Sequence, residues 1–327
     1  MTALPLGLAE IEAARARIAG HIRRTPLLRD PVLSDRVGLP VLMKAEHRQE
    51  TGSFKLRGAT NALMTLPPER LARGVVTAST GNHGRALAHA AKGQGVRAIV
   101  CLSRLVPPNK VAAIRALGAE VRVVGASQDE AMVEVARAVA EEGMTEVPPF
   151  DDPAVVAGQG TLGLEIVEDC PDVATVLVPL SGGGLIGGIA VAIKALRPEA
   201  RVIGLTMETG AAMAASLAAG RPVEVEEGPS LADSLGGGIG AENRVTFPIC
   251  RALLDDVVLL TEAEIAAGIR HLAGLGETVE VAAAVGTAAL LAGKVRATGP
   301  VVMVLSGGNI DPALHARIVA GADGVAA

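Results

Sequence analysis

The chain has 327 residues, half of them hydrophobic, so it is long enough for one large domain or two of ordinary size with a sizeable core. Its formal net charge is −5, and it contains three Phe, no Trp and no Tyr. A protein without a basic surface or stacking aromatic side chains is poorly suited to nucleic acids, so we expect no nucleic-acid partner.

The cysteines and the apolar runs indicate the cellular compartment of the protein. Cys101, Cys170 and Cys250 are widely spaced and odd in number, which fits a reduced compartment and no metal-ligand pattern. Cys101 and Cys250 lie in apolar runs and are expected to be buried. No apolar run reaches membrane-spanning length, and the N-terminus has no basic-then-apolar leader. We expect a cytoplasmic protein with no membrane partner.

The N-terminal part of the chain is predicted to form a surface helix, a short strand and a second helix. Leu8–Ile22 has apolar residues at helical spacing, and Val41–Ala45 has the pattern of a strand. Residues 51–59, Thr-Gly-Ser-Phe-Lys-Leu-Arg-Gly-Ala, predict a turn, an N-cap at Ser53 and a helix that continues to Leu66.

Lys55 falls in the first turn of that second helix. The positive end of the helix dipole disfavours a positive charge there, and crowding and desolvation lower the pKa of an ammonium group. The result is a nucleophilic amine, which Schiff-base chemistry requires. The simpler alternative is a surface lysine on a capped helix.

From residue 75 the pattern alternates between strand and helix, which predicts an open parallel α/β unit. The expected elements are strand Val75–Ala78, helix Asn82–Lys92, strand Val96–Leu102, helix Asn109–Leu117, strand Val121–Val124 and helix Gln128–Glu141. Gly118 marks a helix stop before a strand. Residues 147–153, Val-Pro-Pro-Phe-Asp-Asp-Pro, are the clearest change in composition and predict a crossing between two domains.

A second alternating series follows this crossing. It comprises a helix to about Asp169, strand Thr175–Val178, a glycine loop, helix Leu185–Leu196, strand Val202–Leu205, helices Ala211–Ala219, Arg244–Leu254, Glu262–Leu272 and Ala282–Leu291, and strand Val301–Leu305. The chain therefore predicts an α/β protein with two parallel units and no internal repeats.

The glycine loop, Ser181-Gly182-Gly183-Gly184, comes after a strand and before the helix that begins at Leu185. Backbone amides without side chains can surround a phosphate, and the helix dipole favours its negative charge. A tight turn that uses glycine for steric reasons is the alternative. The loop lacks the Lys-Ser/Thr ending of a nucleotide P-loop.

Four stretches together carry a resemblance to a known family. They are the motif at residues 51–59, Ser79-Thr80-Gly81-Asn82-His83-Gly84, the glycine loop, and Ser306-Gly307-Gly308-Asn309. In this order and spacing they resemble the fold-type II pyridoxal-phosphate enzymes, and within them the threonine dehydratase and serine racemase group. The first two motifs look most like the hydroxyectoine-utilisation dehydratases of that group.

This resemblance covers nearly the whole chain, and it implies a fold. It implies an α/β fold of the tryptophan synthase beta type, with two open twisted parallel-sheet domains and pyridoxal 5′-phosphate between them. The small domain would span residues 47–149, and the large domain residues 1–46 and 150–327. The resemblance also implies a homodimer or homotetramer that acts on a small amino-acid substrate.

The resemblance assigns residues to the cofactor. Lys55 would bind pyridoxal phosphate covalently, and Ser181–Gly184 with Leu185 would hold its phosphate. Asn82 would hydrogen-bond the ring hydroxyl, although an asparagine at a helix start is commonly a cap. Ser306 would face the pyridine nitrogen, although it also suits a turn before two glycines.

A neutral hydroxyl at Ser306 has a consequence for the reaction. A carboxylate at that place keeps the ring protonated and makes it a strong electron sink, whereas a hydroxyl does not. A weaker sink favours prompt loss of a β leaving group. The resemblance therefore indicates β-elimination or racemisation and argues against aminotransferase chemistry.

The substrate-binding candidates, also taken from the resemblance, are Thr51, Ser79, Thr80, Gly81 and His83. Turn capping is the alternative for the three hydroxyl-bearing residues, and a structural role is the simpler interpretation of His83. Thr80 is also a catalytic candidate, because many relatives carry a serine there that reprotonates the opposite face of the substrate. The extra methyl of threonine restricts its hydroxyl, so we expect little racemase activity.

Two acidic residues fall at positions that matter in the family. Relatives have a cation site that corresponds here to Glu208, Ala212 and Ala214, so the second acid is missing. Because Mg²⁺ and Ca²⁺ require several hard oxygen ligands, we predict no metal site from Glu208. Glu280 matches an acidic family position, where it could face the ring or cap a helix.

Together these features predict a pyridoxal-phosphate dependent ammonia-lyase, a dehydratase that converts a β-hydroxy amino acid into a 2-oxo acid and ammonia. Threonine or serine is the generic substrate, and the hydroxyectoine likeness points to a hydroxylated diamino acid or 3-hydroxyaspartate. The alternatives are a 3-hydroxyaspartate dehydratase, a serine racemase, and a small-molecule-binding protein without turnover. The lysine motif differs from the Lys-Asp-Arg of cysteine synthases, which argues against β-replacement.

Overall fold

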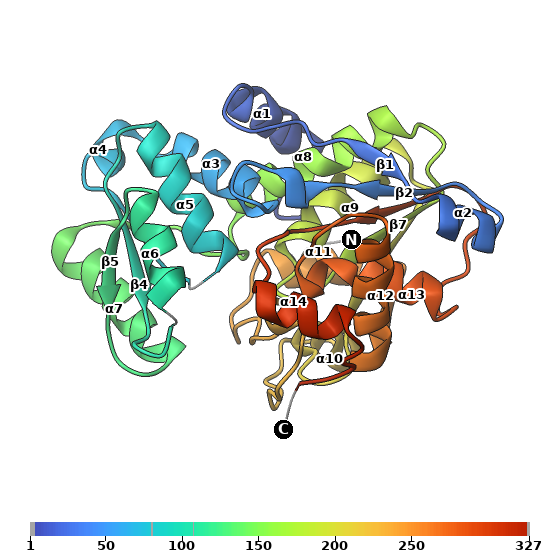
Figure 1. Ribbon diagram of the computed structural model, residues 1–327. Coiled ribbons are helices and arrows are strands. Elements are labelled where there is room, and N and C mark those ends of the chain that lie inside the picture. The colour runs from blue at the N-terminus through green and yellow to red at the C-terminus, as the bar shows by residue number, and fades with distance from the viewer. Residues whose placement is uncertain (1–3, 80, 107, 326–327) are drawn as a thin grey trace.

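A computed structural model describes residues 4–79, 81–106 and 108–325, which form two β-sheets with helices on both faces of each (Figure 1). The six-stranded sheet has the order β1-β2-β10-β7-β8-β9, and the four-stranded sheet has the order β5-β4-β3-β6. All pairs are parallel except β1 with β2. The strands are β1 (Leu27–Arg29), β2 (Val41–Lys44), β3 (Val75–Ala78), β4 (Ala98–Leu102), β5 (Glu120–Val123), β6 (Thr145–Glu146), β7 (Thr175–Pro179), β8 (Arg201–Met207), β9 (Asp256–Leu260) and β10 (Val301–Val304).

The helices cover both faces of each sheet, which is the arrangement expected of parallel strands. The α-helices are α1 (Leu8–Ile18), α2 (Pro31–Val37), α3 (Lys55–Thr65), α4 (Pro68–Leu71), α5 (Asn82–Gly93), α6 (Pro108–Ala116), α7 (Gln128–Glu142), α8 (Pro153–Asp169), α9 (Gly184–Leu196), α10 (Ala212–Ala219), α11 (Thr246–Leu253), α12 (Glu262–Gly274), α13 (Val285–Leu291) and α14 (Pro312–Val319). Three short 3₁₀ helices occupy Glu46–Arg48, Asp233–Leu235 and Val281–Ala284. The α/β architecture with two open parallel sheets agrees with the prediction.

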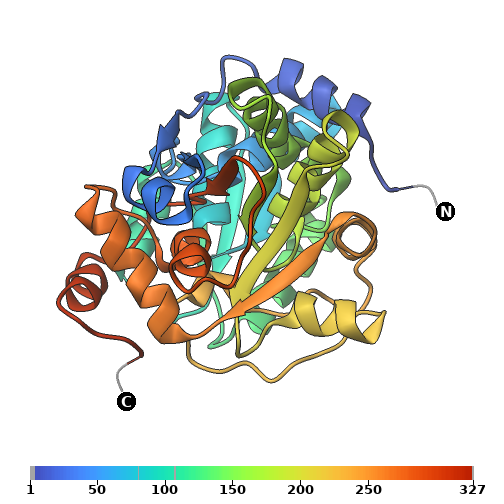
Figure 2. The ribbon, with the colours of Figure 1, turned by 90° about the vertical axis from the view of Figure 1, so that its right-hand side faces the viewer.

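The core of the larger body lies in two layers, one on each face of the six-stranded sheet. In β10, Val301 and Met303 pack with α12 and α13, while Val302 and Val304 pack with α8 and α9. This alternation is the period of two that every strand imposes on its side chains. Figure 2 shows the same division, with α12 to α14 in orange and red on one side of the sheet and α9 to α11 on the other.

The smaller body is layered in the same way. Helices α3, α5 and α6 cover one face of the four-stranded sheet, and α7 covers the other. Cys101 on β4 is buried in the layer under α7, and Cys250 on α11 is buried in the larger body, as predicted for both. Among the described residues no pair of cysteines forms a disulfide.

Helix α3 lies between the two bodies because it packs against helices of both (Figure 1). Where α3 and α8 come closest, Gly58 faces Gly158 without an intervening side chain. A methyl group added at Gly158 would lie 2.6 Å from the carbonyl oxygen of Arg57 and 2.7 Å from Cα of Gly58. Such distances are shorter than van der Waals contact, so only glycine allows the two helix backbones to approach this closely.

Several local predictions are corrected by the structure. Ser53 does not cap α3: the residue before the helix is Phe54, and the Ser53 hydroxyl is buried without a hydrogen-bond partner among the described residues. Backbone pairing with Gly307 takes Ser53 out of the cap position. The first helix ends at Ile18 rather than Ile22, because Gly20 adopts a left-handed conformation with φ of +80°.

Other differences concern short or irregular elements. Strand β9 was not expected, and neither were β1 and β6. The helix expected over Ala282–Leu291 begins as a 3₁₀ turn and becomes α-helical at Val285. Within the described part of the chain, no helix combines the length and the apolar character needed to cross a membrane.

Candidate active site

A pocket of about 280 Å³ lies at the carboxyl ends of strands from both sheets. Ligands of open parallel sheets characteristically bind at this edge. The residues that line the pocket are Phe54, Lys55, Ser79, Gly81, Asn82, His83, Pro149, Phe150, Pro179, Ser181, Gly182, Gly183, Gly184, Leu185, Asp233, Ser234, Leu235, Glu280, Ala282 and Ser306. The structure thus brings together eleven of the thirteen predicted site residues; Thr51 and Thr80 are the exceptions treated below.

Lys55 is the first residue of α3, and its amine faces the pocket. Its Nζ donates a hydrogen bond to the carbonyl oxygen of Pro149 at 2.7 Å and lies 5.2 Å from the centre of the Phe54 ring. Burial lowers the pKa of Lys55 to about 8, although the charge of Glu280 acts in the opposite direction. The amine is therefore much more nucleophilic near neutral pH than that of an exposed lysine.

The glycine loop lies across the pocket at the start of α9. Gly183 has φ of +85°, and a methyl group there would lie 2.8 Å from Cε of Met213 and 3.0 Å from Sγ of Cys250. A side chain at Gly182 would overlap the ring of Phe150. The loop has no room for side chains, and it lines the pocket together with the first residues of α9. This arrangement suits a phosphate group.

Ser306 is brought beside the lysine motif by the chain's C-terminal strand. It follows β10 closely and is buried. Its carbonyl oxygen accepts a hydrogen bond from the amide of Phe54 at 3.0 Å, and Gly307 pairs with Ser53 in a β-bridge. These contacts fix the Ser306 hydroxyl in the pocket wall near Lys55.

His83 is buried on α5, and its Nε2 makes a hydrogen bond of 2.8 Å with the carbonyl oxygen of Val147. Burial, together with the nearby Lys55, lowers the pKa of His83 to about 3, so its ring is neutral at physiological pH. A neutral imidazole that bonds to the backbone fits the structural role that we considered simpler.

The remaining predicted substrate residues divide into three groups. Ser79 and Gly81 line the pocket after β3. Thr51 lies outside the pocket lining, with its hydroxyl buried and its carbonyl oxygen accepting a hydrogen bond from Asn309. Thr80 lies outside the described residues. The substrate roles of all of these residues stay predictions.

Several pocket residues were missed or left open by the sequence analysis. Phe150 and Pro149 come from the segment that we interpreted as a domain crossing, and Asp233 comes from a 3₁₀ turn. Two of the chain's three phenylalanines, Phe54 and Phe150, line the pocket. Because aromatic residues are so rare in this sequence, their positions could have indicated pocket residues. Glu280 proves to face the pocket, where both its oxygens accept hydrogen bonds from Asn82 at 2.8 and 3.0 Å.

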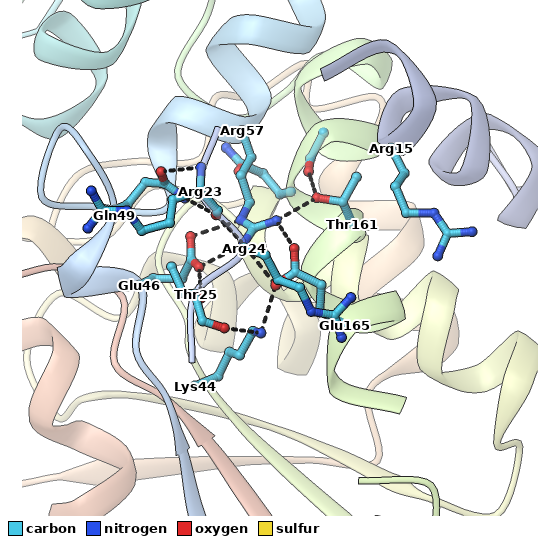
Figure 3. A network of polar contacts seen from close by, with 12 residues as sticks. Arg15, Arg23, Arg24, Thr25, Lys44, Glu46, Gln49, Arg57, Thr161 and Glu165 are labelled. Atoms are coloured by element: carbon cyan, nitrogen blue, oxygen red, sulfur yellow. Dashed lines mark hydrogen bonds and ion pairs between the residues drawn. The ribbon is translucent and has the colours of Figure 1, made fainter. Parts of the chain in front are cut away.

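A buried network of charged side chains anchors the lysine-bearing helix (Figure 3). Arg57, two residues after Lys55, is inaccessible to solvent. Its guanidinium donates hydrogen bonds to Glu46 at 2.9 Å and to Glu165 on α8 at 2.6 Å. Lys44 on β2 lies 2.7 Å from the other oxygen of Glu165. The two cations balance the two carboxylates, and the network ties α3 to β2 and α8.

This network keeps its members charged despite their burial. Desolvation alone would raise the pKa of Glu46, but Arg57 and the hydroxyl of Thr25 hold it below its ordinary value. Desolvation would likewise lower the pKa of Arg57, but Glu46 and Glu165 raise it. A buried pair of this kind is strongly destabilised when one partner is removed.

Metal ligands are not grouped in the described residues. Across residues 4–79, 81–106 and 108–325, no three His, Cys, Asp or Glu side chains are placed to hold a metal ion together. Glu208, the weak candidate from the sequence, lies just after β8 and belongs to no such group.

The pocket residues fit pyridoxal phosphate. The glycine loop and the N-terminus of α9 suit the phosphate, the amine of Lys55 suits an aldehyde, and Asn82 and Ser306 offer polar groups for the ring. The residue that the resemblance places opposite the ring nitrogen is Ser306, which offers a neutral hydroxyl and no carboxylate. These groups are compatible with the cofactor site implied by the resemblance, and their individual roles stay predictions.

Comparison with known proteins gives a consistent result. A family model described as "Pyridoxal-phosphate dependent enzyme" matches residues 18–307. The chain is 62% identical over 318 residues to a "Putative threonine dehydratase" of Sinorhizobium fredii, covering 97% of this chain and 96% of that protein. It is 47% identical over 305 residues to an "L-threonine ammonia-lyase" of Geobacter sulfurreducens, covering 92% of this chain and 75% of that protein.

Solved structures resemble the fold over almost its full length. Maize serine racemase superimposes with a TM-score of 0.90 at 32% identity, covering 95% of this chain and 96% of that one. The processed form of threonine deaminase isoform 2 from Solanum lycopersicum superimposes with a TM-score of 0.89 at 34% identity, covering 96% of this chain and 92% of that one.

Proposed function

Since the chain belongs to the family of pyridoxal-phosphate dependent enzymes, we propose that it is an ammonia-lyase for β-hydroxy amino acids of the threonine and serine type. It eliminates water from the substrate, and hydrolysis of the resulting enamine by one water gives a 2-oxo acid and ammonia. The observation that carries this proposal is the amine of Lys55, which is made nucleophilic by burial and is enclosed between the glycine loop, Asn82 and Ser306.

Bound pyridoxal phosphate supplies an electron sink for the substrate's α-carbon. The protein's own groups do the rest. Lys55 Nζ would bind the cofactor, and as a free amine it would take the proton from the substrate's α-carbon. The glycine loop would hold the phosphate, and Ser306 would offer the ring a neutral hydroxyl rather than a carboxylate. Ser79, Thr80 and Thr51, with nearby amides, are the proposed partners of the substrate carboxylate.

A finer proposal concerns the substrate's second functional group. The resemblance of residues 54–59 and 79–84 to the hydroxyectoine-utilisation dehydratases points to a hydroxylated diamino acid or 3-hydroxyaspartate. Asp233 and Glu280 both line the pocket, and two carboxylates favour an additional amino group over an additional carboxylate. This charge pattern supports a hydroxyectoine-derived hydroxy amino acid more than 3-hydroxyaspartate.

Racemisation is the second candidate function, because a serine racemase is among the similar structures. It needs an acid on the face opposite Lys55, and we propose that Thr80 supplies that position poorly. Thr80→Ser should then increase the ratio of D-serine to pyruvate formed from L-serine. A wild-type ratio near one, or a ratio indifferent to the substitution, would assign the second face to another residue.

The experiment that tests the main proposal measures 2-oxo acid release from a panel of hydroxy amino acids: threonine, serine, 3-hydroxyaspartate and hydroxylated diamino acids. Wild type should release 2-oxo acid and ammonia in equal amounts, and Lys55→Ala should release neither while keeping its fold. A yellow protein that binds the cofactor but turns over none of the panel would favour the alternative of a small-molecule-binding protein.

Three wider expectations remain proposals. We propose that the protein is cytoplasmic, that it forms a homodimer or homotetramer, and that residues 47–149 form a small domain with 1–46 and 150–327 as the large one. The use of β3 to β6 by one sheet and the remaining strands by the other supports that division. Light scattering of the purified protein would test the oligomeric state.

A further inference from the structure

Asn82 belongs to a series of hydrogen bonds beside two adjoining cavities, and it lines both of them. Its Nδ2 donates to both oxygens of Glu280, and its Oδ1 accepts from Nδ2 of Asn309 at 2.6 Å. Asn309 Nδ2 also donates to the carbonyl oxygen of Thr51 at 3.0 Å, and Asn309 Oδ1 accepts from Nη1 of Arg85 at 3.1 Å.

The groups at the two ends of this series, the guanidinium of Arg85 and the carboxylate of Glu280, give the hydrogen bonds a direction. A guanidinium can donate hydrogen bonds and cannot accept them, whereas a carboxylate can only accept. Arg85 therefore fixes which side of the Asn309 amide is oxygen, and the carbonyl of Thr51 fixes the other side as nitrogen. Asn309 and Glu280 then impose the same choice on Asn82, whose amide could otherwise be flipped without a change of shape.

The direction matters because Asn82 lies on the wall between two cavities. The main pocket is lined by Asn82, Glu280 and Lys55, and a smaller cavity is lined by Asn82, Arg85 and Asn309. The amide NH₂ of Asn82 points toward Glu280, which lines both cavities, and its oxygen points toward Asn309, which of the two cavities lines only the smaller one. The side of the amide that is turned away from Asn309, toward the main pocket, is therefore the donor side.

We propose that Glu280 and Asn309 are positioning residues that hold the Asn82 amide with its NH₂ group toward the main pocket, and that Arg85 fixes Asn309 in turn. A bound group with an oxygen acceptor at this wall, as pyridoxal phosphate has in its ring hydroxyl, gains a donor whose orientation is set before binding. Preorganised donors bind more tightly because no reorganisation is needed.

The decisive variant is Asn309→Asp, tested by titrating apoprotein with pyridoxal phosphate. The new carboxylate would face the carbonyl of Thr51 and Oδ1 of Asn82, so three acceptors would meet. Asn82 would rotate to give its NH₂ to the new carboxylate and turn its own oxygen toward the main pocket. The Kd for pyridoxal phosphate should increase by at least about tenfold.

Asn61→Asp is the matched control. Asn61 has the same pattern, because its Nδ2 donates to the carbonyl oxygen of Ala154 at 2.7 Å and its Oδ1 accepts from Arg17 Nη1 at 2.6 Å. It lies on α3 away from the residues that line the pocket. If the Kd of Asn309→Asp stays within about threefold of that of Asn61→Asp, the proposal is overturned.

Two variants at Glu280 decide the matter independently, including the case in which Asn309→Asp does not fold. Glu280→Gln keeps a carbonyl acceptor without charge and should leave the Kd within about threefold of wild type, whereas Glu280→Leu should increase it at least about tenfold. Equal weakening by both variants would assign the effect to the charge and overturn the proposal. Because Kd is read without turnover, absence of 2-oxo acid release would count against the proposed function alone.

Discussion

At the scale of single residues, the amine of Lys55 is the group whose environment determines what the site can do. It is partly buried at the start of a helix, and burial brings its pKa down to about 8, from the 10.5 of an ordinary lysine. The neutral amine is the form that attacks an aldehyde. Its availability thus rises steeply over the physiological pH range.

The first prediction follows from this pKa. The rate at which apoprotein captures pyridoxal phosphate should increase about tenfold per pH unit below 8 and level off above it, because the neutral fraction of Lys55 follows that curve. Glu280 raises this pKa, so Glu280→Gln should move the midpoint to lower pH. The rates can be followed by absorbance, and borohydride reduction with peptide mapping should locate the label on Lys55.

A midpoint near 10.5 would contradict the environment described for Lys55, and a label on another lysine would contradict its role. Lys44 is the informative comparison. It is fully buried and held by Glu165 and Asp169, so it should stay unlabelled although it is also a buried lysine.

The second prediction concerns Ser306, whose hydroxyl is proposed to meet the ring nitrogen. Ser306→Asp should keep the ring protonated, slow 2-oxo acid release by roughly tenfold and produce pyridoxamine phosphate, which chromatography detects. Ser306→Ala is the control, since it introduces no charge and should form no pyridoxamine phosphate. Unchanged release with no pyridoxamine in the aspartate variant would show that Ser306 does not face the nitrogen.

At the scale of elements, the site is built where strands end. Parallel strands place their carboxyl ends at one edge of a sheet, which is enough to predict that the motifs after β7 and β10 converge. The motif after β3 ends the other sheet, and its place in the same pocket was implied only by the family resemblance. The glycine loop shows how closely the following helix must then pack. Gly183 is bounded on one side by Met213, Cys250 and Thr246, and Gly182 by Phe150.

The third prediction uses Gly183→Ala with Gly220→Ala as its control. Both glycines have left-handed conformations, with φ of +85° and +72°, so each alanine carries a backbone strain of about 1–2 kcal/mol. At Gly183 the methyl group would also meet three side chains at 2.8–3.0 Å, whereas at Gly220 nothing lies within 4 Å. The loop must shift in the first case.

Gly183→Ala should therefore raise the Kd for pyridoxal phosphate at least about tenfold, while Gly220→Ala should leave it unchanged. The titration used for the apoprotein measures both, and melting of the apoproteins reports the shared strain. Equal affinities in the two variants would show that the glycine loop does not hold the phosphate.

The elements also show where sequence reasoning stopped. Periodicity found the long helices and the buried strands, because their apolar runs are long. It missed β9, an edge strand on which all residues but Leu260 are partly or fully exposed. The local composition predicted an N-cap at Ser53. The pairing of Ser53 with Gly307, which prevents that cap, could not be predicted because it joins residues far apart in the chain. Phe150 and Asp233 were missed for the same reason: neither lies in a motif, and only the tertiary fold brings them to the pocket.

At the scale of the whole molecule, α3 is the element shared by both bodies. One face packs with α5 in the core of the smaller body, and the other meets α8 through Gly58, Gly158 and the charged network of Arg57. A domain boundary at residue 47 therefore assigns α3 to one body although it is bonded to both. That boundary stays a prediction, and the network offers a way to measure how strongly the two bodies are coupled.

The last prediction is that Arg57→Met destabilises the folded protein by about 3–5 kcal/mol, because it leaves Glu46 and Glu165 buried with Lys44 as their remaining cation. Arg97→Met is the control. Arg97 also pairs with two carboxylates, but its side chain is half exposed, so its loss should cost less than about 1 kcal/mol. Urea unfolding at neutral pH measures both.

The pH dependence separates the charge of this network from its packing. The folded-state pKa of Glu46 lies below its ordinary value of 4.5, so ionised Glu46 stabilises the fold above that pH. This contribution is lost as the pH falls through the folded-state pKa. In Arg57→Met the buried carboxyl of Glu46 lacks the guanidinium that lowers its pKa, so its ionised form no longer stabilises the fold. The stability gap between wild type and Arg57→Met should therefore narrow below pH 4.5, whereas a gap caused by lost packing alone would stay constant with pH.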